Sequence, residues 1–143
     1  MPKKPLLKNK TIIIGCGRLG SSIANKITRE GKNLLVIDVN HQAFENLDDS
    51  FSGYQIVGDV TDLDVLEEAY ISSAKEIIIT TGNDNVNIFL ALVSRDVYDV
   101  PNIYVRLDDP TYEILLRGKN VELILPFQLT YDKFNLVRGG KKK

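Results

Sequence analysis

One stretch of the chain limits its possible folds more than any other: residues 11–20, TIIIGCGRLG. Three consecutive β-branched residues, Ile12 to Ile14, predict a strand buried on both faces, as in a parallel sheet. A Gly-x-Gly-x-x-Gly turn follows at once, and the next helix would begin near Arg18. Its unpaired N–H groups would point at whatever lies over the turn, so we expect an anion there. The alternative is a tight strand-to-helix turn that binds no ligand.

The composition bounds the class of protein. The 143 residues fit one domain, and the hydrophobic fraction of 43% is typical of a soluble protein. A net charge of −1 gives no basic footprint for nucleic acid. The single Cys16 cannot form an internal disulfide, which is consistent with a reducing cytosol. Without a signal peptide or an apolar run of about twenty residues, we expect a cytoplasmic protein, peripheral to the inner face of the cell membrane if it serves a membrane process.

Strand and helix patterns alternate along the chain. Strands are expected at 12–14, 33–38, 55–57, 76–80, 102–107 and 121–125, and helices at 21–30, 41–48, 83–98 and 110–117, with another carrying Leu63, Leu66 and Ala69. This pattern predicts an α/β fold: a Rossmann-like doubly wound sheet of six mainly parallel strands with helices on both faces. We expect a flexible basic N-terminus at 1–10, the nucleotide-binding domain at 11–125, and a C-terminal arm with a solvated lysine tail at 126–143.

Two helices carry more apolar surface than one sheet can cover. In the helix at 83–98, Val86, Phe89, Leu90, Val93 and Val97 form one face, while Ile88, Ala91 and Leu92 fill much of another. We expect its own sheet and a partner subunit to cover it, although its own neighbours could crowd it instead. After Pro126, apolar residues recur at helical spacing at Phe127, Tyr131, Phe134 and Val137. This helix would either cross to a partner subunit or fold back on its own domain.

Asp38 is the first candidate for ligand contact outside the turn. It lies about twenty residues past the glycines, at the end of the second strand. A carboxylate there accepts hydrogen bonds from both ribose hydroxyls and repels a 2′-phosphate, which favours NAD or an adenine nucleotide over NADP. The alternative for Asp38 is a helix cap. His41 lies near enough to touch the base, but a solvated loop histidine is the preferred interpretation.

Further candidates carry charge or follow a strand. The Arg18 guanidinium can fork onto phosphate oxygens, or it is simply solvated. Asp59 would lie near the adenine, whereas Thr80, Thr81, Asn83 and Asp84 follow the fourth strand at the switch point of the sheet, where they could also be turn formers and caps. Arg106 lies inside an apolar strand and needs a partner, which Asp108, Asp109 or a ligand phosphate could provide.

The complete candidate set for ligand binding is Gly15, Cys16, Gly17, Arg18, Leu19, Gly20, Asp38, Val39, His41, Gly58, Asp59, Val60, Thr80, Thr81, Gly82, Asn83, Asp84 and Arg106. Catalytic candidates are lacking. His41 is the only histidine and Cys16 lies inside the turn, so no Ser-His-Asp or Cys-His arrangement and no Cys and His metal site can be assembled. The sequence therefore favours binding without turnover.

Several motifs, in order, resemble the nucleotide-binding half of RCK or KTN (TrkA-N) domains, the cytosolic regulators of potassium channels and transporters of the Trk and Ktr type. They are GCGRLGSSIA at 15–24, VID ending at Asp38, VGDVTD at 57–62, ITTGNDNVNIFLAL at 79–92 and YVRLDDP at 104–110. The motif positions that match are Gly15, Gly17, Arg18, Gly20, Asp38, Asp59 and Asp84. The resemblance implies a cleft that binds NAD(H), ATP or ADP, and homodimers that assemble into a ring, a tetramer or an octamer, beneath a potassium channel or transporter subunit.

Two features depart from that family's pattern. Family members often continue into a second, ligand-sensing domain, for which this sequence shows no counterpart; the alternatives are a piece of a longer protein and a short member of the family. They also usually carry an acid after the proline of the last strand, whereas Phe127 follows Pro126 here.

The resulting hypothesis is a regulatory subunit or domain that gates its membrane partner through a ligand-dependent change in subunit arrangement. The alternatives are a small NAD-dependent oxidoreductase domain that needs a partner chain, and a Rossmann interaction module that binds no nucleotide.

Overall fold

The computed structural model describes residues 10–140 and contains one six-stranded sheet with the order β3-β2-β1-β4-β5-β6. All five strand pairs are parallel. The strands are β1 (Lys10–Ile14), β2 (Leu34–Asp38), β3 (Tyr54–Val57), β4 (Ala74–Ile79), β5 (Asn102–Arg106) and β6 (Glu122–Ile124). This is the strand order of doubly wound dinucleotide folds, with its switch point between β1 and β4. The predicted fold class is confirmed.

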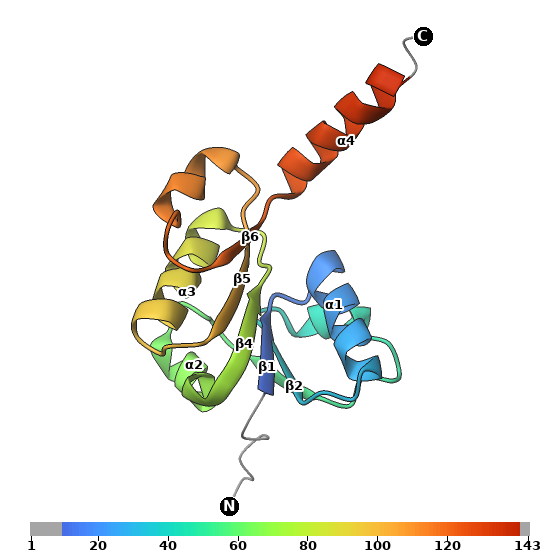
Figure 1. The fold of residues 1–143 in the computed structure, drawn as a ribbon. Coiled ribbons are helices and arrows are strands. Elements are labelled where there is room, and N and C mark those ends of the chain that lie inside the picture. The colour runs from blue at the N-terminus through green and yellow to red at the C-terminus, as the bar shows by residue number, and fades with distance from the viewer. Residues whose placement is uncertain (1–9, 141–143) are drawn as a thin grey trace, which may run out of the picture.

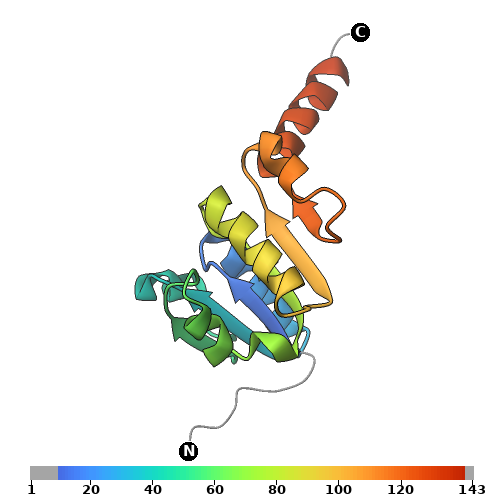
Figure 2. The same ribbon diagram turned by 90° about the vertical axis from the view of Figure 1, so that its left-hand side faces the viewer.

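Helices cover both faces of the sheet, as Figure 1 and, turned by 90°, Figure 2 show. On one face lie α1 (Arg18–Arg29) and the 3-10 helix η1 (His41–Asn46). The other face carries α2 (Leu63–Glu68), the 3-10 helices η2 (Ile71–Ser73) and η3 (Pro110–Leu115), and α3 (Asp84–Asp96). The central strands supply both cores because their side chains alternate: Ile13 faces α1, whereas Ile12 and Ile14 face α3. All three isoleucines are at most 1% exposed.

Two predicted helices are shorter than expected and are 3-10 helices. The segment expected at 41–48 is η1, which buries only Phe44, and the one expected at 110–117 is η3, which buries no residue. Asn40 and Asp109 cap these segments through their side chains. Because neither segment has a continuous apolar stripe, there is little packing to extend it into a regular α-helix.

Lys10 contradicts the expectation of a flexible basic terminus at 1–10. It is the first residue of β1 and only 1% exposed, and its Nζ donates to the carbonyl oxygens of Ala69 at 2.5 Å and Tyr70 at 3.2 Å. The ammonium lies 5.4 Å from the centre of the Tyr70 ring. Burial lowers the pKa of Lys10 to about 8. Residues 1–9 and the lysines at 141–143 lie outside the described residues.

The buried face of α3 differs from the expected one. The buried residues are Asn87, Ile88, Leu90, Ala91 and Ser94, so the stripe that faces the sheet includes two polar side chains. Phe89 is 37% exposed and Val97 62% exposed. The sheet covers one side of α3. The side chains of Phe89 and Val97 lie outside that side and stay partly open to solvent.

The last helix, α4 (Pro126–Gly140), projects away from the sheet, as Figures 1 and 2 both show. No residue of α4 is buried, and Phe127, Tyr131 and Phe134 are each more than half exposed. The expectation that this helix folds back on its own domain is therefore wrong. Among residues 10–140, no helix has both the length and the apolar character needed to cross a membrane.

Candidate functional site

The glycine turn joins β1 to α1 at the switch point of the sheet. Gly15 has a φ of +99°, which favours glycine, and Gly20 lies so close to the turn that a Cβ atom would stand 1.8 Å from the Gly15 carbonyl oxygen. The Thr80 hydroxyl, at the end of β4, is 3.1 Å from the carbonyl oxygens of both Ile14 and Gly15, so its single proton is shared between them. Thr80 thus fixes the turn against β4 and is only 5% exposed.

Asp38, at the end of β2, is half-buried beside the turn. Its Oδ2 accepts a hydrogen bond of 2.7 Å from the backbone N–H of Cys16, and its Oδ1 accepts one of 2.8 Å from Asn40. The predicted alternative, a helix cap, belongs instead to Asn40, which caps η1. Each carboxylate oxygen has a second lone-pair site. Asp38 therefore holds two loops together and can still accept hydrogen bonds from a diol.

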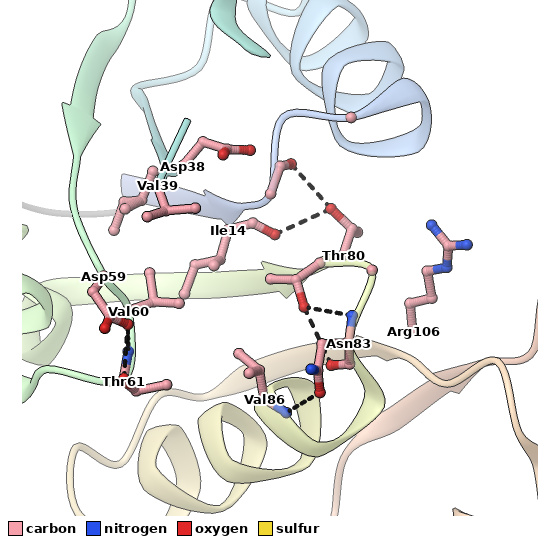
Figure 3. A pocket seen from close by; sticks show the side chains of 15 residues that line it. Ile14, Asp38, Val39, Asp59, Val60, Thr61, Thr80, Asn83, Val86 and Arg106 are labelled. Atoms are coloured by element: carbon pink, nitrogen blue, oxygen red, sulfur yellow. Dashed lines mark hydrogen bonds between the residues drawn. The ribbon is translucent and has the colours of Figure 1, made fainter. Parts of the chain in front are cut away.

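A pocket of about 520 Å³ opens at the carboxyl ends of the strands. Figure 3 shows Asp38 and Asp59 on one side of it and Arg106 on the opposite side, with Thr80 and Asn83 between them. Its lining comprises Ile14, Gly15, Gly17, Ile37, Asp38, Val39, Asp59, Val60, Thr61, Thr80, Thr81, Gly82, Asn83, Val86 and Arg106. The structure thus brings together residues from five loops or strand ends that are far apart in the sequence.

Asn87 supports the floor of this pocket without lining it. Its side chain is fully buried, and its Nδ2 donates to the carbonyl oxygens of Thr81 at 3.0 Å and Arg106 at 2.9 Å. Its Oδ1 accepts a hydrogen bond from the Thr81 hydroxyl. Asn83 caps α3 through a bond from the Val86 N–H. These bonds fix the loop after β4 and the end of β5 relative to each other.

Asp59 forms a local turn at the rim. Its Oδ1 accepts hydrogen bonds from the backbone N–H of Thr61 at 2.9 Å and from the Thr61 hydroxyl at 2.7 Å. These bonds lower the pKa of Asp59 below its ordinary value. The carboxylate stays charged at neutral pH and is exposed at the rim of the pocket.

Arg106 forms an ion pair with Asp108, one of the partners expected from the sequence. Its Nε donates to Asp108 Oδ1 at 3.0 Å, and the guanidinium also lines a second cavity of about 590 Å³. Arg18, Leu19, Ser22, Ile124, Pro126 and Leu129 complete this second cavity, which lies between α1, β6 and the first turn of α4. The structure places Arg18 here, on the exposed start of α1, and not in the lining of the first pocket.

Other candidates lie outside the lining of the first pocket. Gly58 packs against Val65: a Cβ atom added to Gly58 would lie 2.9 Å from the Val65 side chain. His41 is exposed, and its ring contacts the Phe44 ring edge-on. Asp84 accepts hydrogen bonds from the backbone N–H groups of Asp108 and Asp109. Cys16 is fully buried in the core beneath α1, and Leu19 lines the second cavity. Ligand contact by all of these residues stays a prediction.

The sequence interpretation missed four lining residues. Ile14 and Ile37 are apolar positions at strand ends, Thr61 belongs to the loop after β3, and Val86 lies in the first turn of α3. Only their position could have predicted them, because ligands of doubly wound sheets bind at the carboxyl ends of the strands and contact the residues there.

The site offers little for covalent or metal chemistry. Burial, with a smaller contribution from the Asp38 charge, raises the pKa of Cys16 to about 11, so the thiol stays protonated at neutral pH and is a poor nucleophile. Among residues 10–140, no group of three or more His, Cys, Asp or Glu side chains is arranged to hold a metal ion.

Comparisons with known proteins identify the family of this chain. The model of the TrkA-N domain matches residues 11–125. The Trk system potassium uptake protein TrkA of Streptomyces coelicolor is 37% identical over 122 residues, which cover 85% of this chain and 55% of that protein. A TrkA homolog of Methanothermobacter thermautotrophicus is 29% identical over 114 residues, which cover 80% of this chain and 52% of that protein. The chain spans about half the length of these relatives.

Solved structures show the same fold at low identity. The TrkA-N domain of the inner membrane protein YbaL from Escherichia coli superimposes with a TM-score of 0.78 at 17% identity, covering 91% of this chain and 97% of that chain. The GsuK channel bound to NAD gives a TM-score of 0.70 at 20% identity over 87% of this chain and 23% of that chain. The expected resemblance is confirmed: this chain belongs to the TrkA-N domain family.

Proposed function

We propose that this chain is the nucleotide-binding regulatory domain of a potassium uptake system of the Trk or Ktr type, acting at the cytoplasmic face of the membrane. The observation that carries the proposal is the pocket at the switch point, where the glycine turn and the Asp38 carboxylate lie at one end. Relatives named as potassium uptake proteins and neighbours solved with NAD and with ADP support it.

The pocket residues fit an adenine nucleotide, NAD(H) or ATP/ADP. Asp38 accepts hydrogen bonds from the ribose hydroxyls, and its charge disfavours a 2′-phosphate. Gly17 lines the pocket and has no atom within 4 Å of where its Cβ would stand, so a phosphate can approach the backbone at the start of α1. The adenine then lies toward Val39, Asp59 and Val60, on the β2 and β3 side.

Binding without turnover is part of the proposal. The ionisable side chains that line the pocket are Asp38, Asp59 and Arg106, and each already makes a hydrogen bond to a residue two positions further along the chain. An oxidoreductase would need a group that moves a proton at the reacting carbon. Hydride exchange between NADH and a carbonyl substrate by the isolated protein would support that alternative and contradict the regulator.

The projecting α4 supports a homodimer. Its exposed Phe127, Tyr131 and Phe134 lie on one side of the helix, and the rings of Phe127 and Tyr131 stack with their centres 6.0 Å apart. A second copy of the chain would remove this apolar surface from water. Dimers of this kind would assemble into the ring, a tetramer or an octamer, that contacts the membrane subunit.

Gating then follows from population shift. A nucleotide biases the assembly only through its difference in affinity between two subunit arrangements. Shifting the assembly from about 1% to about 99% in one arrangement takes about 5.5 kcal/mol, summed over all sites of the ring. Shared among four or eight sites, each nucleotide needs to contribute only about 1 kcal/mol.

Calorimetric titration with NADH, ATP and ADP tests the central claim. We expect at least one nucleotide to bind the unchanged protein and Asp38→Ala to weaken it strongly. The control is Asp49→Ala, because Asp49 is an exposed aspartate that does not line the pocket. If none of the three nucleotides binds, or if both variants bind equally, the proposed site is wrong.

A further inference from the structure

Among residues 10–140, Arg106 is the only basic side chain that lines the nucleotide pocket. It lies on the side of the pocket opposite Asp38 and Asp59, as Figure 3 shows. Its guanidinium does not face the pocket alone: Nε donates to Asp108 Oδ1 at 3.0 Å, and Nη2 lies 3.5 Å from Oδ2. A carboxylate therefore occupies one of the edges of the guanidinium that can bind a phosphate side-on.

The backbone around Asp108 is held in place. The N–H groups of Asp108 and Asp109 donate to the two oxygens of Asp84, at 2.8 and 2.9 Å, and the Leu107 N–H donates to the Ile124 carbonyl at 3.0 Å. Asp84 itself is the first residue of α3. Because three consecutive N–H groups are tied to α3 and β6, a ligand cannot displace this segment as a whole. The backbone of Asp108 is therefore fixed next to Arg106, which keeps its carboxylate within reach of the guanidinium.

The backbone of Arg106 is also fixed by a hydrogen bond. Its carbonyl oxygen accepts a hydrogen bond from buried Asn87, so its backbone is as fixed as that of Asp108. Its side chain is 29% exposed, and that of Asp108 is 47% exposed. An ion pair in this position is weak enough for a ligand phosphate to compete with it.

We propose, on the basis of the proposed function, that Asp108 is a specificity-determining residue: a built-in counter-ion that competes with ligand phosphates for Arg106. Its charge repels each additional phosphate that extends along the pocket toward β5. The site therefore selects nucleotides of low charge, such as a dinucleotide with two bridging phosphates, over nucleoside triphosphates. No other carboxylate among the described residues has an ion pair with Arg106.

The test compares the affinities of AMP, ADP, ATP and NADH for three forms of the full chain by calorimetry. Asp108→Asn removes the charge and keeps the size of the side chain. The matched control is Asp96→Asn, because Asp96 forms an exposed pair with Arg95 at the far end of α3, and its loss changes the net charge equally. We expect Asp108→Asn to raise ATP affinity about tenfold and AMP affinity about twofold or less, since Coulomb repulsion scales with ligand charge. The control should change all four affinities less than about twofold.

Three outcomes would overturn the inference while leaving the proposed function intact. They are an equal gain for all four nucleotides, a gain no larger than that of Asp96→Asn, and a loss of affinity, which would mean that Asp108 orients Arg106 for the ligand. Absence of binding by the unchanged protein would overturn both the proposed function and the inference. Asp108→Ser, which removes the same charge, should reproduce the dependence on phosphate number and guards against a folding defect in a single variant.

Discussion

Gly17 and Gly20 belong to the same turn, yet one added methyl group is expected to act differently at the two positions. At Gly20 a Cβ atom would stand 1.8 Å from the Gly15 carbonyl oxygen and 2.7 Å from the Thr80 hydroxyl. The backbone atom cannot move away without opening the packing of α1 on β1. We expect Gly20→Ala to lower the free energy of unfolding by about 3 kcal/mol or more, at the upper end of overpacking effects.

At Gly17 the same methyl group meets no atom within 4 Å, and φ is −76°, which any residue can adopt. Alanine restricts the unfolded chain, a gain of about 0.4–1 kcal/mol, but it is a poorer helix cap than glycine. The two effects offset each other, so the free energy of unfolding should change by less than about 1 kcal/mol. Because Gly17 lines the pocket, the methyl group would instead exclude a phosphate and reduce NADH affinity about tenfold or more.

Thermal unfolding without ligand separates the two glycines. At about 2–4 °C per kcal/mol, Gly20→Ala should lower Tm by about 6–12 °C, and Gly17→Ala should shift it by less than about 4 °C. Titration with NADH then measures the binding effect at Gly17. The reasoning fails if Gly20→Ala is as stable as the unchanged protein, or if Gly17→Ala is destabilised as strongly as Gly20→Ala.

Three further predictions follow from buried or exposed contacts. Asn87→Leu should lower the free energy of unfolding by about 2–4 kcal/mol in urea, because it leaves the Thr81 and Arg106 carbonyls unpaired; a loss below 1 kcal/mol would contradict this. Burial lowers the pKa of Lys10 to about 8 from its ordinary 10.5, so the unfolded chain binds the extra proton and stability should rise between pH 8 and 10.5. Lys10→Met should flatten that rise in unfolding experiments across the range, and an unchanged slope would count against the assignment. Phe134→Asp on α4 should shift the protein toward monomer in analytical ultracentrifugation, whereas the neighbouring exposed change Asn135→Asp should not; equal behaviour would exclude this face from the dimer.

Local signals were sufficient for the sheet and for one end of the pocket. Three consecutive isoleucines in β1 and the run LLVID in β2 are typical of strands buried on both faces of a covered parallel sheet, and in such a sheet the glycine turn lies beside Asp38. The switch point followed from the alternation of strands and helices, without knowledge of any contact. The ends of the predicted strands differ by up to two residues from the structure.

Contacts between distant segments could not be predicted in the same way. In the sequence, Lys10 belongs to a group of lysines near the N-terminus, which is typical of an exposed end. Its burial depends on hydrogen bonds to the carbonyl groups of Ala69 and Tyr70, which are distant in the sequence. Asp84 lies in a motif for ligand binding, but its carboxylate accepts hydrogen bonds from backbone groups 24 and 25 residues away. For Arg106 the sequence offered Asp108, Asp109 or a ligand, and only the structure distinguishes them. In each case the contact is made by a backbone group or by a side chain whose position depends on a loop. Contacts of this kind produce no periodic pattern in the sequence.

The exposure of α4 also matters for protein engineering. Since none of its residues is buried, the cores on both faces of the sheet are complete without it. Its outer turns can therefore be exchanged for a designed coiled coil of chosen stoichiometry, or fused to a fluorescent protein, with little effect on the packing of the domain. On the basis of the proposed dimer and its ligand-dependent arrangement, the distance between two such arms would report whether the pocket is occupied.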